Sequence, residues 1–154
     1  MKTTRSILVP IFIISFFFLV ACPHNDNNPE LTALQKKAVS LTGTWSNASN
    51  VSVPNGVDGT VLDQLTLTFN SDTDHNPTSF SASGASDFLL SQSSSTWSLS
   101  GSDLNLINLT GVSPVSQLSI MNLTDTELTI KFTYMTPSAR AEKLDGDYQV
   151  TLSR

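Results

Sequence analysis

The stretch SLTGTWSN, residues 40–47, is where the pattern of this sequence changes. Before it, over residues 29–40, apolar residues recur at the spacing of a helix. From Gly43 onward they alternate with small polar residues, which is the two-residue period of a β-strand. Because later runs keep that period, the stretch predicts a short helix followed by an all-β domain.

The predicted helix over residues 29–40 has recognisable ends. Asn28 can cap the first free backbone amides, Pro29 fits the first helical position, and Lys36 and Lys37 suit the negative end of the helix dipole. One apolar stripe runs along it, formed by Leu31, Leu34, Ala38 and Leu41. We expect the following domain to cover this stripe; the alternative is a helix that lies on a membrane surface.

Downstream, alternating runs are separated by polar turns. The runs are 65–69, 97–99, 104–106, 118–120, 128–134 and 148–152, and the turns are 70–77, 100–103, 124–127 and 144–147. Such short connections favour antiparallel neighbours, since a parallel crossover needs about a dozen residues or more. Each run has one apolar face and one face rich in Ser and Thr, so we predict about eight strands around a single core, in a barrel or a sandwich.

The opening of the first strand favours the barrel. A helix followed by Gly43-Thr44-Trp45 resembles the Gly-x-Trp opening of lipocalin-like proteins. In that family the tryptophan closes the narrow end of the barrel, and an arginine at or after the last strand packs over it. The resemblance therefore implies an antiparallel up-and-down β-barrel in which Gly43, Trp45 and Arg154 form the barrel closure, with a β-sandwich as the alternative.

More of the chain resembles small bacterial lipoproteins with lipocalin-like domains. The shared features are the LTLTF strand (65–69), the WSLSG hairpin (97–101), the LTDTEL hairpin (123–128) and a closing segment with Arg140, Leu144, Gly146, Tyr148 and Leu152. All of these motifs are structural, and the lipocalin disulfide is missing because the chain has one cysteine. The resemblance therefore implies the fold and leaves the capacity for a ligand open.

The first 21 residues are typical of an export signal. Lys2 and Arg5 precede an apolar run from Ile7 to Val20. That run is shorter than the roughly 20 apolar residues of a membrane-spanning helix, and Pro10 interrupts it. We therefore expect this segment to be exported and cleaved.

Cys22 stands at the end of the apolar run. Leu-Val-Ala-Cys, residues 19–22, resembles the lipobox of bacterial lipoproteins, in which cleavage leaves a lipidated cysteine as the first residue. The resemblance makes residues 1–21 a cleaved lipoprotein signal peptide, with Ala21 and Cys22 flanking the cut, Cys22 the lipidated residue and 22–28 a tether. It implies lipid anchoring in the cell envelope, in the outer rather than the inner membrane. The alternative is an ordinary secretory peptide with an incidental cysteine.

The charge of the chain argues against nucleic acid as a partner. Lys and Arg total 8 against 13 Asp and Glu, giving a net charge of −5, and removal of Lys2 and Arg5 makes the mature chain more acidic. The remaining basic residues are scattered, whereas a phosphate-binding surface needs them clustered. The same acidity argues that the body does not lie flat on anionic lipid.

Candidate catalytic and metal-binding residues are few. Asn70, Asp72, Asp74, His75 and Asn76 form an oxygen-rich cluster, but it lacks the glycine and the distant glutamate of a calcium loop. Asp and Asn are also the residues that hairpin loops use. We therefore expect no metal site here.

Catalysis is not expected from the remaining polar residues either. His24, the other histidine, falls in the tether, and the chain has no Gly-x-Ser-x-Gly nucleophile motif. Asp145 and Asp147 flank Gly146 in a turn, where solvent keeps carboxylates from acting as a tuned acid–base pair. The sequence thus predicts no enzyme and no cofactor.

Two functions stay open for the predicted single domain, residues 29–154, which we expect to be monomeric. Inward positions are mostly large apolar residues, and an eight-stranded barrel is just wide enough to be filled by them. A filled core is one alternative, and a modest apolar cavity open at one end is the other. The first hypothesis is a non-catalytic barrel that binds a small hydrophobic ligand; the second is an interaction or structural envelope module with a solid core.

Overall fold

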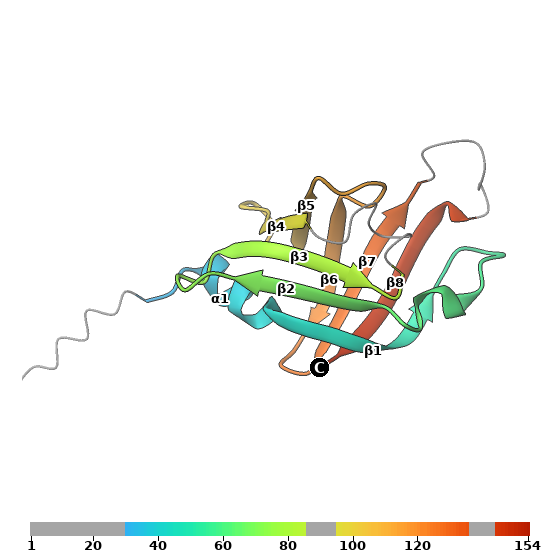
Figure 1. Cartoon of the computed structure of the whole chain (residues 1–154), viewed down its shortest axis with the longest axis horizontal. Helices are drawn as coiled ribbons and strands as arrows, with labels where there is room; N and C mark the ends of the chain where they lie inside the picture. Colours follow the sequence, from blue (N-terminus) through green and yellow to red (C-terminus); the bar gives the residue numbers. More distant parts are fainter. Residues whose placement is uncertain (1–29, 86–94, 136–143) are drawn as a thin grey trace, which may run out of the picture.

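The computed structural model describes residues 30–85, 95–135 and 144–154. Within them, eight antiparallel strands form a closed barrel in chain order, and the last strand pairs with the first (Figure 1). The strands are β1 (Gly43–Ser52), β2 (Thr66–Ser71), β3 (Pro77–Ser83), β4 (Ser95–Leu99), β5 (Leu106–Thr110), β6 (Gln117–Leu123), β7 (Glu127–Tyr134) and β8 (Gly146–Ser153). The predicted up-and-down barrel is confirmed, and the sandwich is excluded.

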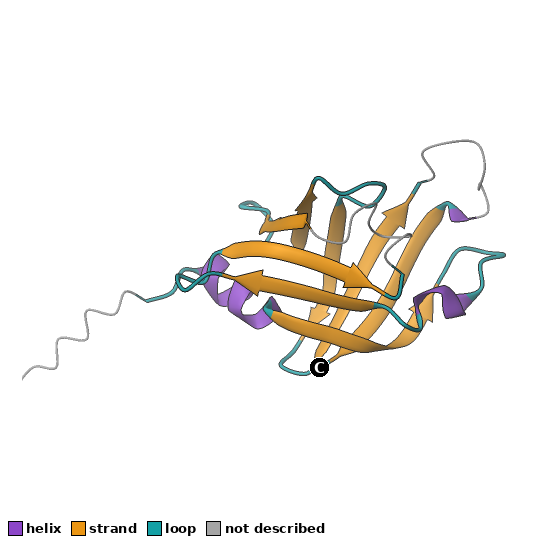
Figure 2. Ribbon diagram, in the orientation of Figure 1, coloured by secondary structure: helices purple, strands orange, loops and turns teal. Residues whose placement is uncertain are grey.

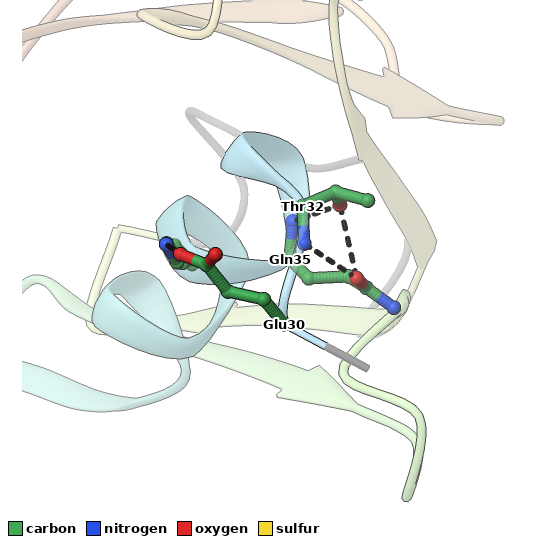
Figure 3. Close-up of polar contacts among 4 residues, drawn as sticks. Glu30, Thr32 and Gln35 are labelled. Carbon is green, nitrogen blue, oxygen red and sulfur yellow. Dashed lines mark hydrogen bonds and ion pairs between the residues drawn. The ribbon is translucent and has the colours of Figure 1, made fainter. Parts of the chain in front are cut away.

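Helix α1 (Ala33–Leu41) precedes β1 and starts four residues later than predicted. Its cap is Thr32, whose Oγ1 accepts a hydrogen bond from the Gln35 N–H (3.2 Å), while Gln35 Oε1 accepts one from the Thr32 N–H (2.9 Å; Figure 3). This reciprocal capping box satisfies two amides that the helix leaves free. With Asn28 as the cap, Leu31 would hold the third helical position and could return no hydrogen bond.

The two ends of the barrel differ (Figure 2). At one, which we call the helix end, α1 lies with the β2–β3, β4–β5 and β6–β7 turns. Gln35 Nε2 donates to the Asp74 carbonyl (2.9 Å) and Lys37 Nζ to Asn105 Oδ1 (3.1 Å), which ties α1 to two of those turns. The other, the loop end, carries the β1–β2 connection with the 3-10 helix η1 (Gly59–Leu62), the β5–β6 connection, the ends of β3 and β7 and the starts of β4 and β8.

The core runs the length of the barrel. Every strand contributes inward side chains, and Ala38 and Leu41 of α1 and Leu62 of η1 join them with 0% exposure. The largest fully buried side chains are Trp45, Tyr148, Phe69, Phe80, Leu41, Leu62, Leu65, Leu67, Ile107, Leu118 and Leu128. The stripe of α1 is therefore covered by the barrel at Ala38 and Leu41, as expected.

Two strands differ from the predicted pattern. In β5 the inward, buried residues are Ile107 and Leu109, so the prediction that 104 and 106 face inward was wrong. Leu104 lies before the strand, in a turn where the Asp103 carboxylate accepts a hydrogen bond from the Asn105 N–H (2.8 Å). β3 was not predicted at all, because Phe80 is the only large apolar side chain among its seven residues. The pairing of β3 with β2 and β4, and of β5 with β4 and β6, determines which of their residues face inward.

The seam between β1 and β8 contains two bulges. The paired residues are Ser46 with Ser153, Ser49 with Thr151, and Ser52 with Gln149. Between successive pairs β1 advances by three residues while β8 advances by two, so β1 carries one extra residue in each interval. Asn47 and Asn50 adopt positive φ angles of 54° and 48°, which Asn tolerates better than most residues with a side chain. The repeated Ser-Asn-x pattern of residues 46–51 lets β1 coil enough to close the barrel.

Candidate functional site

Trp45 anchors the helix end of the barrel. It comes from the start of β1, points inward and is fully buried. Its indole Nε1–H donates a hydrogen bond to the carbonyl of Leu41, the last residue of α1, at 2.8 Å. A buried tryptophan needs a partner for this one polar atom, so the bond that satisfies it also holds the end of α1 against the barrel.

Arg154 lies over the same ring. Its guanidinium carbon is 4.3 Å from the centre of the Trp45 ring, within the range of a cation–π interaction. Its Nη1 donates to the Thr42 carbonyl (2.9 Å), and its Nε donates to the Asp125 carbonyl (2.7 Å) in the β6–β7 turn. One side chain thus connects the start of β1, the end of β8 and the β6–β7 turn.

Gly43 completes this arrangement. Its φ of 129° lies in a region that favours glycine, and a Cβ there would lie 3.4 Å from Arg154 Nη1. The structure therefore brings together Gly43, Trp45 and Arg154, the residues to which the resemblance assigned the barrel closure.

Aromatic side chains line the interior near both ends. Toward the helix end, the Phe69 ring centre lies 5.0 Å from that of Phe80 and 5.1 Å from that of Trp97. Trp97 Nε1 donates to the Asn70 carbonyl (2.8 Å). Because its N–H is satisfied there, this group presents only apolar surface inward.

A second aromatic group lies toward the loop end. Phe132 stacks on Tyr148 with ring centres 5.3 Å apart, and Tyr134 meets Tyr148 edge-on at 6.4 Å. The Tyr148 hydroxyl donates to the carbonyl of Leu144. Burial, with the nearby Tyr134 and Asp145, raises the pKa of Tyr148. The hydroxyl therefore stays neutral at ordinary pH, and the interior keeps its uncharged character.

The interior shows no charge among the residues that the structure describes. Thr151 is the one buried polar side chain in this part of the chain, and its hydroxyl pairs with that of Thr129 (2.9 Å) on the outer face. The inward side chains, such as Leu67, Ile130 and Val150, are apolar and fully buried. The described interior can therefore accommodate uncharged apolar groups, which are either the protein's own side chains or parts of a ligand.

Half-buried apolar side chains gather at the loop end. They come from the β1–β2, β5–β6 and β7–β8 connections and pack against the core: Val53, Val57, Val61, Val112 and Leu144. We call this set the apolar rim. No periodicity marks these residues in the sequence, so they were not predicted.

The β1–β2 connection is pressed against the barrel at two places. A Cβ on Gly146 at the start of β8 would lie 2.6 Å from Pro54 Cγ, and one on Gly84 would lie 1.8 Å from the Gln64 carbonyl oxygen. Only glycine permits such close approach. Leu62 lies between these points with 0% exposure, so the connection forms part of the wall at the loop end.

The predicted oxygen-rich cluster is a turn. Asp72 Oδ1 accepts from the N–H groups of Asp74 (2.9 Å) and Asn76 (2.8 Å), and these bonds hold the pKa of Asp72 below its usual range. His75 completes the turn with a φ of 63°. Within residues 30–85, 95–135 and 144–154, no three His, Cys, Asp or Glu side chains gather as metal ligands would.

Asp147 lies on the outer face of the barrel. Hydrogen bonds from Lys131 (2.8 Å) and Thr133 (2.7 Å) lower its pKa. An exposed carboxylate with a lowered pKa is a poor general acid. The nearest pocket, of about 360 Å³, opens on this outer face beside Lys131 and Asp147.

Other predicted residues fall elsewhere. Ala21, Cys22, the tether 22–28, which includes His24, and Arg140 lie outside the described residues. A pocket of about 590 Å³ opens at the helix end between Glu30, Gln35 and Asp74. In the described part of the chain, no helix has the length and apolar character to cross a membrane.

The chain matches a known protein family. The sequence model of the lipocalin-like domain family matches residues 41–130. No curated protein and no solved structure matches the chain. The matched region begins at the end of α1, includes Gly43 and Trp45, and ends inside β7.

Proposed function

The chain belongs to the lipocalin-like domain family, and from that membership we propose that it is a non-catalytic protein whose barrel binds a small hydrophobic ligand. The observation that carries this proposal is the contrast between the two ends. Trp45, Arg154 and α1 close the helix end with a network of hydrogen bonds. The loop end has five half-buried valine and leucine side chains, the apolar rim. The helix end has three of its own, Leu34, Leu104 and Leu123, but there the Trp45–Arg154 network closes the opening.

The described interior indicates the chemistry of the ligand. Aromatic and aliphatic side chains face inward, and the polar atoms of both tryptophans and Tyr148 are used within the protein. A charged group buried among them would lose its hydration without gaining a partner, at a cost of several kcal/mol. We therefore propose an uncharged ligand, or one whose polar end stays at the loop end.

We also propose that the protein is a lipid-anchored lipoprotein of the bacterial envelope, in the outer membrane. The support is the charged start, the apolar run and the Leu-Val-Ala-Cys stretch of residues 1–22. Two or three acyl chains on Cys22 would hold the chain on a membrane essentially permanently, since each buried methylene contributes about 0.8 kcal/mol. The mass of the mature N-terminus tests this, with Cys22→Ser as the variant that should lose both lipid and membrane attachment.

Ligand binding is tested on the chain purified without residues 1–22. We expect lipid in an organic extract of the protein and saturable binding of a fluorescent fatty-acid analogue. Val57→Asp, in the apolar rim, should weaken binding at least tenfold, whereas Asn55→Asp, exposed in the same connection, should leave it unchanged. Circular dichroism would verify that both variants fold. An empty extract together with no probe binding would contradict the proposal.

A module with a solid core is the second candidate, because inward side chains such as Leu67, Ile130 and Val150 are fully buried, as they would be in a filled barrel. In that case the loops and outer face would contact another envelope protein. Crosslinking in intact cells distinguishes the two functions. A reproducible protein partner, combined with a barrel that yields no extractable ligand, would favour the second.

A further inference from the structure

We infer that the barrel stands on its anchoring membrane with the helix end facing the lipid and the apolar rim directed away from it. This inference rests on the proposed lipid anchor at Cys22. It identifies the helix end as the membrane-facing surface and the loop end as the surface that meets the aqueous compartment.

The chain enters the barrel at a fixed point on the helix end (Figure 1). Glu30 is the first described residue, and its carboxylate pairs with Lys36 Nζ at 2.5 Å. The capping box of Thr32 and Gln35 follows directly, and Gln35 also holds the Asp74 carbonyl in the β2–β3 turn (Figure 3). These contacts fix where any segment preceding Glu30 must leave the domain.

The reach from the anchor is short compared with the barrel. Eight residue steps separate Cys22 from Glu30, and a chain spans at most about 3.5 Å per residue, hence about 28 Å. β8, which pairs with β7 in unbroken register, has eight residues, about 26 Å along the strand and about 20 Å along a barrel axis at the usual tilt. α1 lies beyond one end of that wall and η1 beyond the other. To place the rim in the anchoring membrane, the segment would have to run back fully extended along the whole barrel.

The acidic residues of the helix end keep it a short distance from an anionic lipid surface, while the tether still holds this end nearest the membrane. Asp72, Asp74, Asp103 and Asp125 lie in its turns and are exposed. Together with Glu30 they outnumber the cations at this end, which are Lys36, Lys37 and Arg154. Acidic groups are repelled by anionic headgroups over roughly a Debye length, about 8 Å at physiological salt. The helix end therefore faces the membrane across a hydrated gap, and a ligand entering at the rim would come from the aqueous side.

The test uses the full lipidated chain in phosphatidylcholine vesicles that carry a headgroup quencher. Because lipidation consumes the thiol of Cys22, an introduced cysteine is the only one available for a fluorophore. Thr73→Cys reports on the helix end and Asn55→Cys on the loop end, and both positions are exposed. Ser102→Cys and Ser116→Cys form a second pair with the same placement.

We expect quenching at positions 73 and 102 to exceed that at 55 and 116 at least threefold. Addition of phosphatidylglycerol should reduce the quenching at 73, and about 1 M salt should restore it. Equal or stronger quenching at 55 and 116 on vesicles that retain the protein would overturn the orientation alone. Failure of the chain to remain on vesicles would overturn the lipid anchor as well, and ligand binding, measured separately, would stand in either case.

Discussion

Arg154 places its guanidinium 4.3 Å from the centre of the Trp45 ring, so the end of the last strand covers the first large core residue of the first. The same side chain donates to two backbone carbonyls, at Thr42 and Asp125. Trp45 in turn holds the end of α1 through Leu41. The contact therefore couples barrel closure to the docking of the helix.

Replacement of Arg154 should weaken this closure. Arg154→Ala removes the cation–π contact and both hydrogen bonds, and we expect a loss of about 2 kcal/mol in the free energy of unfolding. Arg154→Lys keeps the charge but not the paired donors, so its free energy of unfolding should lie between those of the parent and Arg154→Ala. Urea unfolding followed by tryptophan fluorescence measures this. Lys131→Ala, which removes the exposed pair with Asp147, is the control and should change stability less.

Gly84 should not tolerate a side chain. Its φ is 79°, and a Cβ would lie 1.8 Å from the Gln64 carbonyl oxygen, so Gly84→Ala should cost at least about 3 kcal/mol. Gly56 has a similar φ of 85° but no atom within 4 Å of a Cβ. Gly56→Ala therefore measures the backbone strain alone, about 1 kcal/mol. Equal thermal stabilities of the two variants would contradict the close packing at Gly84.

The bulge at Asn50 predicts an unusual order of substitutions. Asn50→Gly should be tolerated, because glycine adopts a φ near 48° without strain. Asn50→Val should cost about 1–2 kcal/mol, although valine normally favours strands. Ser52→Val, also exposed on β1 but without a positive φ, serves as the control and should be neutral. A neutral Asn50→Val would show that β1 does not bulge there.

The capping box can be tested at the start of α1. Thr32→Ala removes the side-chain acceptor for the Gln35 N–H, and we expect a loss of about 1 kcal/mol in the free energy of unfolding. Thr32→Ser should retain most of the stability that Thr32→Ala loses, since the hydroxyl acceptor remains. Thermal unfolding of both variants measures the difference. If the helix were instead capped at Asn28, the Thr32 variants would be indistinguishable from the parent.

Asp72 predicts a loss of stability in acid. Its pKa is held below the ordinary 3.8 by the hydrogen bond from the Asn76 N–H. A depressed folded-state pKa means that the unfolded chain takes up the proton first, so this contribution is present above the ordinary pKa and lost as the pH falls toward the folded value. The urea midpoint of the parent should thus decline below about pH 4 more steeply than that of Asp72→Asn. Parallel pH profiles would contradict the role of this carboxylate.

The barrel was predictable because most of its strands alternate strictly. Leu128, Ile130 and Phe132 show the period of two without help from neighbours, and the first strand carried the Gly-x-Trp opening. The phase of β5 was not predictable, because Leu104, Leu106, Ile107 and Leu109 satisfy either choice of inward face locally. Its pairing with β4, which sets Leu109 opposite Trp97, decides between them.

The candidate site was only partly predictable for a similar reason. Gly43, Trp45 and Arg154 could be named because the resemblance linked positions far apart in the chain. The rim residues Val53 and Val112 come from irregular connections, where position depends on packing and no period exists to indicate it. The cap at Thr32 had a local signal in the Thr-x-x-Gln spacing, but Asn-Pro before it was an equally ordinary helix start.

The two bulges of β1 have a consequence for the time before the barrel is closed. Each of the strands β1 to β7 pairs with the strand that follows it in the chain. The second edge of β1 pairs with β8, so it stays unpaired until the last strand is in place. A regular edge strand with free amides is a template for association with other chains, and bulges make it a poor one. The bulges at Asn47 and Asn50 would therefore reduce aggregation of the incomplete barrel. Replacement of these residues by strand-favouring ones should lower the yield of soluble protein on refolding.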